Sequence, residues 1–276
     1  MRSLREPLVL AGVALLGLLL TVAVLAPLLS PYDPQAVAGD SLERPSAHHL
    51  LGTNNVGQDI FSQILFGARS SLSVAVGAAV LTVVVGVAIG VTGGLVGGWA
   101  DTVTMRLADV FLALPRLPLL VVIAALAGPS RVNLVFAIGL MIWPVVARVV
   151  RGQTRSLRQR GFVGAARGFG GGLVHVVRRH LVPALSPVIV TAFVNVAAVA
   201  VLLEAGLAFL GLADPNAVSW GLMMNRALLQ PGLYFTPMWT WWVVPTGLAI
   251  SLAVLAFTFL GVGLEPVINP RLRRGR

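Results

Sequence analysis

Residues 72–97 read LSVAVGAAVLTVVVGVAIGVTGGLVG, an apolar run without a charged residue. A helix of about 20 residues is long enough to cross the roughly 30 Å hydrocarbon core of a bilayer. Because a helix pairs all of its backbone polar groups within one segment, this run predicts a membrane-spanning helix. Similar runs lie along the whole chain, and the sequence predicts an all-α membrane protein with six transmembrane helices. The expected spans are 8–29, 72–97, 108–127, 133–150, 185–211 and 240–264.

The composition supports a membrane protein and excludes several kinds of chemistry. Of the 276 residues, 57% are hydrophobic and 11% are charged, whereas soluble domains carry about 25% charged residues. The chain has no cysteine, which excludes disulfides, thiolate metal sites and cysteine nucleophiles. It also has no lysine, so it cannot supply the Gly-Lys-Ser/Thr ending of a phosphate-binding P-loop. If ATP drives this protein, another subunit must hydrolyse it.

The net charge of +10 reflects arginines that gather on one side of the expected spans. With the N-terminus inside, fifteen of the twenty arginines fall in cytoplasmic segments, and Arg116 at the start of the third span is left uncounted. Four fall in outer segments, namely Arg44, Arg69, Arg131 and Arg226. This bias predicts that both termini are cytoplasmic, and it explains the charge better than nucleic-acid binding does. The run 8–29 resembles a signal peptide, but it lacks a small-residue cleavage site, so we expect an uncleaved first span.

The expected spans divide the chain into three parts. Residues 1–70 comprise the first span and an extracytoplasmic segment, and residues 71–265 comprise the transmembrane core, with a cytoplasmic loop at about 151–184. Residues 266–276 form a basic cytoplasmic tail.

Two patterns within the core predict how its helices pack and bend. Glycines recur every fourth residue in the second span and predict one face for close helix packing; they are Gly86, Gly90, Gly94 and Gly98. Prolines 115 and 118 predict a kink near the third span.

The long cytoplasmic stretch 148–187 combines arginines with an apolar stripe. The stripe recurs at helical spacing and comprises Phe162, Ala166, Phe169, Leu173 and Val176. Pro183 is expected to end this helix, and Pro187 to begin the next span. A basic amphipathic helix either lies on anionic lipid or docks into a groove on a partner, and the residues alone leave both readings open.

Three segments carry a resemblance to a known family. The series Gly164-Ala165-Ala166, Gly170 and Pro183 resembles the "EAA" loop of ABC importer permeases, E-A-A-x3-G-x9-I-x-L-P. HHLLGTNNVGQDIFSQILFGARSSLSVAVG resembles H-P-L-G-T-D-x-x-G-R-D and the span that follows it. LLEAGLAFLGLADPNAVSWGLMM resembles A-E-A-x-L-x-F-L-G-L-G…P-x-W-G-x-M. The chain is therefore similar, over essentially residues 1–275, to the C-type subunits of the dipeptide/oligopeptide permease family.

This resemblance implies a six-helix permease half of the type I ABC importer fold in a bacterial cytoplasmic (inner) membrane. It implies four kinds of partner besides the lipid bilayer: a homologous B-type permease, two ABC ATPase subunits and an extracytoplasmic substrate-binding protein. ATP and Mg would be held by the ATPase subunits, and no cofactor by this chain. The implied cargo is a short peptide, and close relatives handle nickel chelates, glutathione or haem. No nucleic-acid partner is expected.

The resemblance also carries over site residues where this sequence matches the motif. The loop that couples to the ATPase maps to Gly164, Ala165, Ala166, Arg167, Gly170 and Pro183. The matching positions of the outer segment are Gly52, Thr53, Gly57 and Asp59. Two departures stand out: the family's glutamate is Gly164 here, and its outer Asp and Arg are Asn54 and Gln58.

Glu204, in the middle of the fifth span, is the candidate for the translocation pathway, because a carboxyl group inside a membrane span is costly and usually functional. The alternative is a hydrogen-bonded glutamate that pins helices together. Asn195 lies 2.5 turns earlier and is expected on the opposite face. One acid without a second acid, base or metal ligand predicts no active site, so we expect no enzyme. His48 and His49 are adjacent and have no third ligand nearby, so no metal site is expected.

A secondary transporter driven by an ion gradient is the rival of another class. It predicts paired inverted repeats and several acids within the membrane. The sequence has one such acid and no evident repeat.

Overall fold

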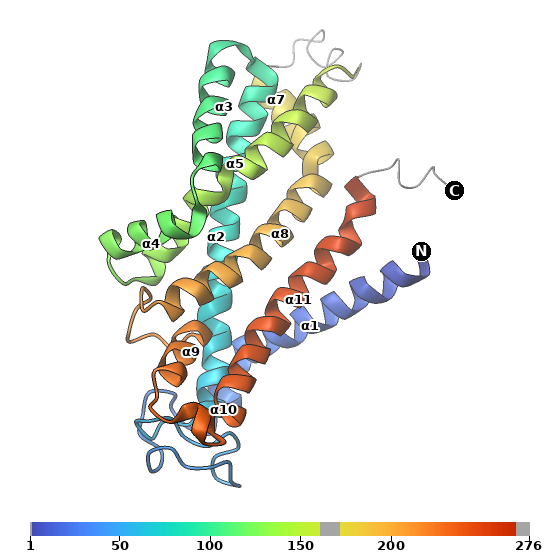
Figure 1. Ribbon diagram of the computed structural model, residues 1–276. Helices are drawn as coiled ribbons and strands as arrows, with labels where there is room; N and C mark the ends of the chain where they lie inside the picture. Colours follow the sequence, from blue (N-terminus) through green and yellow to red (C-terminus); the bar gives the residue numbers. More distant parts are fainter. Residues whose placement is uncertain (1, 161–171, 269–276) are drawn as a thin grey trace.

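The computed structural model describes residues 2–160 and 172–268, and its helices are shown in Figure 1. The helices are α1 (Arg2–Leu29), α2 (Ile60–Val96), α3 (Gly98–Ala113), α4 (Arg116–Ala127), α5 (Arg131–Arg158), α7 (Leu173–Val176), the π-helical turn η1 (Val177–Leu181), α8 (Val182–Phe209), α9 (Trp220–Leu228), the 3-10 turn η2 (Leu233–Phe235), α10 (Met238–Trp241) and α11 (Val243–Ile268). Five helical stretches of the described chain are long and apolar enough to cross a membrane, or six if the bent pair α3–α4 forms one span.

The long helix α2 runs through the molecule and packs on α5, α8 and α1, while α11 packs on α1 and α8 (Figure 1). The end of α5 lies at the upper end of Figure 1, which we call the inner end, while the end of α11 lies in the upper half and the start of α1 lies about halfway up. Residues 30–59 lie at the lower end, which we call the outer end. The orientation of these ends relative to the membrane stays a prediction from the arginine bias.

The stripe of glycines on α2 is confirmed at three of its four positions. A Cβ atom added to Gly86, Gly90 or Gly94 would lie 2.6–2.7 Å from atoms of α5. Only glycine allows the two helices to approach this closely. Gly98 does not belong to this face, because α2 ends at Val96 and Gly98 opens α3 with a φ of +70° and no neighbour within 4 Å of an added Cβ.

The expected span 108–127 is not one continuous helix. The chain forms α3 and α4 instead, bent by 95°. Leu114, between them, has an extended ψ of 141°. Proline disfavours helical geometry in the residue before it and has no N–H to donate, so Pro115 ends one helix and starts another. The predicted kink is thus confirmed, although it is a complete break.

Two other boundaries differ from the expectation. Helix α2 starts at Ile60 rather than 72, because the Asp59 side chain accepts a hydrogen bond from the Ser62 N–H at 2.8 Å and caps the helix. Pro183 does not end a helix: the segment Leu173–Phe209 is one helical stretch with the turn η1 directly before this proline. The wider π turn relieves the clash between a proline ring and the preceding carbonyl groups.

Candidate functional site

The inner end contains the flanks of the expected coupling loop. Gly164, Ala165, Ala166, Arg167 and Gly170 lie outside the described residues, as does most of the apolar stripe. Of the loop's site residues, Pro183 is described, near the start of α8. The loop therefore joins the end of α5 to the continuous helical stretch α7–η1–α8.

An ion-pair cluster around a buried carboxyl group ties α3 to α5. Asp101 of α3 is 3% exposed. It accepts hydrogen bonds from Arg151 Nε at 2.5 Å and Nη2 at 2.6 Å, and from Arg155 Nη2 at 2.6 Å. Two parallel bonds from one guanidinium are the strongest arrangement of such a pair. One carboxyl group thus anchors two arginines of α5.

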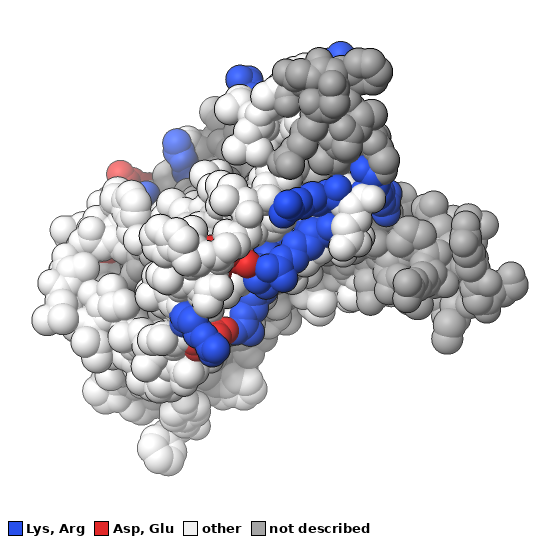
Figure 2. All heavy atoms as spheres, turned by 90° about the horizontal axis from the view of Figure 1, so that it is seen from above, with Lys and Arg blue, Asp and Glu red and all other residues white. Residues whose placement is uncertain are grey.

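A second pair lies nearer the exposed surface, where Arg148 of α5 meets Asp109 of α3. Figure 2, seen from above, shows a band of arginine side chains across this end with acidic side chains beside it. Sequence analysis counted these arginines as a sign of topology and missed their partners. Asp101 and Asp109 lie 50 and 39 residues before Arg151 and Arg148, so no local pattern in the sequence links the partners.

At the outer end, the four predicted family positions lie in one folded segment on the start of α2. Gly52 and Gly57 have φ values of +68° and +77°, which favour glycine. The Thr53 hydroxyl donates to the Asp40 carbonyl at 2.5 Å and accepts from the Glu43 N–H at 2.9 Å. These three positions therefore hold the turns of the segment in place.

Asp59 joins this segment to the helix. Besides capping α2, it lies 2.9 Å from Nδ1 of His49, which is 4% exposed. The Tyr32 ring lies 4.9 Å from the His49 ring. His49 is thus a packed partner of Asp59.

The departures Asn54 and Gln58 also contact each other. The Asn54 amide donates to Gln58 Oε1 at 2.9 Å. A neutral hydrogen bond therefore occupies the positions where the family has an acidic and a basic residue.

Glu204 lies where α8, α2 and α9 meet, and it is 1% exposed. Its carboxyl group faces the hydroxyls of Ser71 on α2 and Ser219 before α9. Within the described chain Oε2 has no hydrogen-bond partner. Both hydroxyls also accept a backbone N–H at 3.3 Å, from Trp220 and Leu222 respectively, so their protons are free to be donated to Glu204.

This arrangement favours the alternative in which Glu204 holds helices together, because one carboxyl group connects three helices. Asn195 is exposed and lies against Gly261 of α11, so the two polar residues of α8 face different neighbours, as expected. The pathway role of Glu204 stays a prediction.

A bundle of apolar helices, a folded polar segment at one end and a charged junction at the other define a helical membrane protein. The family described as "Binding-protein-dependent transport system inner membrane component" matches residues 83–274. The "N-terminal TM domain of oligopeptide transport permease C" matches residues 2–46. The chain belongs to the family of binding-protein-dependent transport system inner membrane components.

Curated relatives match nearly the whole chain. A protein of Brucella suis named as a peptide permease is 40% identical over 98% of this chain and 89% of its own length. A Brucella abortus protein named in the same way has the same identity and shares. The glutathione transport system permease protein GsiD of Pectobacterium atrosepticum is 35% identical over 99% of this chain and 90% of its own length.

These similarities confirm the resemblance seen in the sequence. The chain is a permease subunit of an ABC importer, of the oligopeptide C type, and a multi-pass inner-membrane protein. The family implies a complex in which further components complete the importer.

Proposed function

We propose that this chain forms one half of the translocation path of an importer for short peptides. The observation that carries the proposal is the similarity, over 98% of the chain, to proteins named as peptide permeases. Glutathione is a second candidate cargo, favoured by the similarity to glutathione permeases over 99% of the chain. Both cargoes are small zwitterionic peptides.

The proposed partners are a homologous B-type permease, two ATPase subunits that hold ATP and Mg, and an extracytoplasmic binding protein. The loop around Gly164, Ala165, Ala166, Arg167 and Gly170 docks on an ATPase subunit, and the small residues allow its backbone to come close. With this loop on the cytoplasmic side, both termini are cytoplasmic as well, as the arginine bias predicts.

The fold offers two routes for movement from the docked loop into the membrane. The first runs through α5 to α3, because Asp101 holds Arg151 and Arg155. The second runs through the continuous stretch Leu173–Phe209, which includes Pro183. Closure of the ATPase subunits would then move these helices as near-rigid bodies and switch access between the two sides of the membrane.

Transport by the reconstituted complex tests the proposal. The chain and its companion subunits are placed in proteoliposomes with the binding protein, and uptake of a labelled dipeptide is followed with and without ATP. We expect uptake that requires ATP and survives ionophores. Uptake that persists without ATP and follows an ion gradient would contradict the proposal and favour a secondary transporter.

A further inference from the structure

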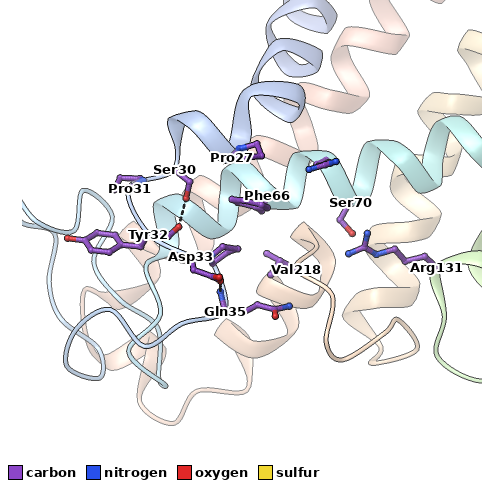
Figure 3. Close-up of a pocket in the computed structure, with 12 residues that line it drawn as sticks. Pro27, Ser30, Pro31, Tyr32, Asp33, Gln35, Phe66, Ser70, Arg131 and Val218 are labelled. Carbon is purple, nitrogen blue, oxygen red and sulfur yellow. Dashed lines mark hydrogen bonds between the residues drawn. The ribbon is translucent and has the colours of Figure 1, made fainter.

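A cavity of about 610 Å³ opens at the outer end, between the end of α1, residues 31–35, α2 and the start of α5 (Figure 3). Its volume lies within the range of about 300–1,000 Å³ that is typical of small-molecule sites. Charged and polar side chains from separate segments line it, including Asp33, Gln35, Arg69, Ser70 and Arg131. Neither the ion pairs of Asp101 nor the contacts of Glu204 assign a role to this cavity.

Two arginines of the lining are not neutralised by a salt bridge in the described chain, and the Arg131 charge acts at longer range on the buried Glu204 carboxyl group. Within the described chain, neither Arg69 nor Arg131 forms a salt bridge, in contrast to Arg151 and Arg155 at the inner end. Figure 3 shows the Arg131 side chain extending towards Ser70. Arg131 is also the first residue of a 28-residue helix whose N-cap Ser130 makes no side-chain bond. Free N–H groups and the helix dipole add positive potential there, so this part of the cavity attracts an anion.

The opposite charge lies elsewhere in the same lining. In Figure 3, Asp33 and Arg131 lie on opposite sides, with Val218 between them. Asp33 Oδ1 accepts a hydrogen bond from the Gln35 N–H at 2.8 Å, and the described chain gives Asp33 no salt bridge. A peptide with free ends carries one carboxylate and one ammonium group, which complement this arrangement.

The wall of the cavity beside Arg131 is held in place by residues on its far side. Ser70 and Val218 line the cavity, and the residues that follow them, Ser71 and Ser219, hold Glu204. A wall held by a buried carboxyl group is pre-formed, so a ligand need not order it on binding.

We propose that this cavity binds short peptides by their two ends, the carboxylate at Arg69 and Arg131 and the ammonium at Asp33. The inference rests on the proposed function and adds to it a recognition site on the permease itself. An arginine pairs with a carboxylate through two parallel hydrogen bonds, which makes the free carboxylate the larger contribution. A zwitterionic lipid headgroup shares this chemistry, and the experiment separates the two sources.

The test uses the chain with its companion permease and ATPase subunits in phosphatidylcholine nanodiscs, without binding protein. The probe is labelled alanyl-alanine, and the competitors are its C-terminal amide and its N-acetyl derivative. We expect the free dipeptide to bind about tenfold more tightly than the amide, because a charge-assisted hydrogen bond is lost. Arg131→Gln and Arg69→Gln should reduce this preference and leave the discrimination against the N-acetyl derivative. Asp33→Asn should do the reverse.

Arg44→Gln is the matched control, since Arg44 is an exposed outer arginine outside the cavity lining, and it should change neither preference. Equal binding of dipeptide and amide, or no binding of either, would overturn the proposal without any variant. Nanodiscs of phosphatidylethanolamine form the lipid arm. If that lipid abolishes dipeptide binding in the wild type but not in Arg131→Gln, the headgroup is the occupant and the proposal is wrong.

Uptake of the same dipeptide, with ATP and the binding protein, separates the two proposals. Normal uptake without end-group discrimination overturns the cavity site alone. Absence of dipeptide uptake by the wild-type complex counts against the proposed function itself.

Discussion

Arginines at the two ends of this permease have different roles. At the inner end, Arg151 and Arg155 are held by a nearly inaccessible Asp101, so their charge serves to fasten α5 to α3. At the outer end, Arg69 and Arg131 line a cavity without a salt bridge in the described chain. The same side chain is therefore structural where it forms a salt bridge with a buried acid, and available to a ligand where it forms no salt bridge.

The largest expected effect comes from breaking the inner end at the loop. Ala166→Glu places a bulky charge where an ATPase backbone is proposed to come close, and we expect ATP-driven uptake to be lost. Co-purification of the ATPase with the variant, together with its ATPase rate, measures the coupling. The membrane helices should remain intact, as judged by thermal unfolding. Unchanged assembly with unchanged uptake would refute the coupling role of this loop.

Asp101→Ala tests whether the ion pairs of Arg151 and Arg155 stabilise the fold. Removing one partner of a buried pair costs about 3–5 kcal/mol, and we expect about 3 because Arg151 is 25% exposed. Thermal unfolding in detergent measures the loss. Asp109→Ala is the matched control, because its pair with Arg148 is 44–47% exposed and such pairs contribute less than about 1 kcal/mol. Equal losses of stability in the two variants would show that burial of Asp101 does not increase the contribution of its ion pairs.

Gly90→Leu tests how much the close packing of α2 on α5 contributes to stability. An added Cβ would lie 2.7 Å from the Ala147 carbonyl oxygen and 2.8 Å from Val150 Cβ. Overpacking of this kind costs about 1–3 kcal/mol, which should appear as a lower unfolding temperature. Gly152→Leu on α5 is the control, since nothing lies within 4 Å of its added Cβ. If Gly152→Leu destabilises the protein as much, close approach of the helices is not the cause.

Glu204 has the smallest expected effect when it is changed to Gln. Glutamine keeps an oxygen that can accept from Ser71 and Ser219, so we expect stability within about 1 kcal/mol of the wild type and retained uptake. Glu204→Ala removes the acceptor and should cost about 1–3 kcal/mol. Unfolding temperature and uptake are measured on both variants. Normal stability with lost uptake in Glu204→Gln would instead establish the pathway role.

The fold class and several packing features could be predicted from sequence because they depend on neighbours along the chain. A long apolar run is costly in water wherever it occurs, and glycines at every fourth position share one helix face. The break at Pro115 followed from a local rule, although its extent did not. Boundaries shifted where a cap decided them, as Asp59 did for α2.

The site was less accessible to sequence analysis. The outer family positions were found by their motif, but their role in holding turns became visible only with Thr53 and Asp59 in place. The partner of Arg151 was not found, because Asp101 lies on another helix and no local pattern links the two.

The sequence by itself determined that this chain enters a membrane as helices and which family it belongs to. Only the tertiary structure decided which charges are paired and which remain open to a ligand. The physical reason is the distance along the chain over which each property is set. Burial in lipid is set by the side chains of a single segment, whereas an ion pair or a cavity depends on which distant segments the packing brings together.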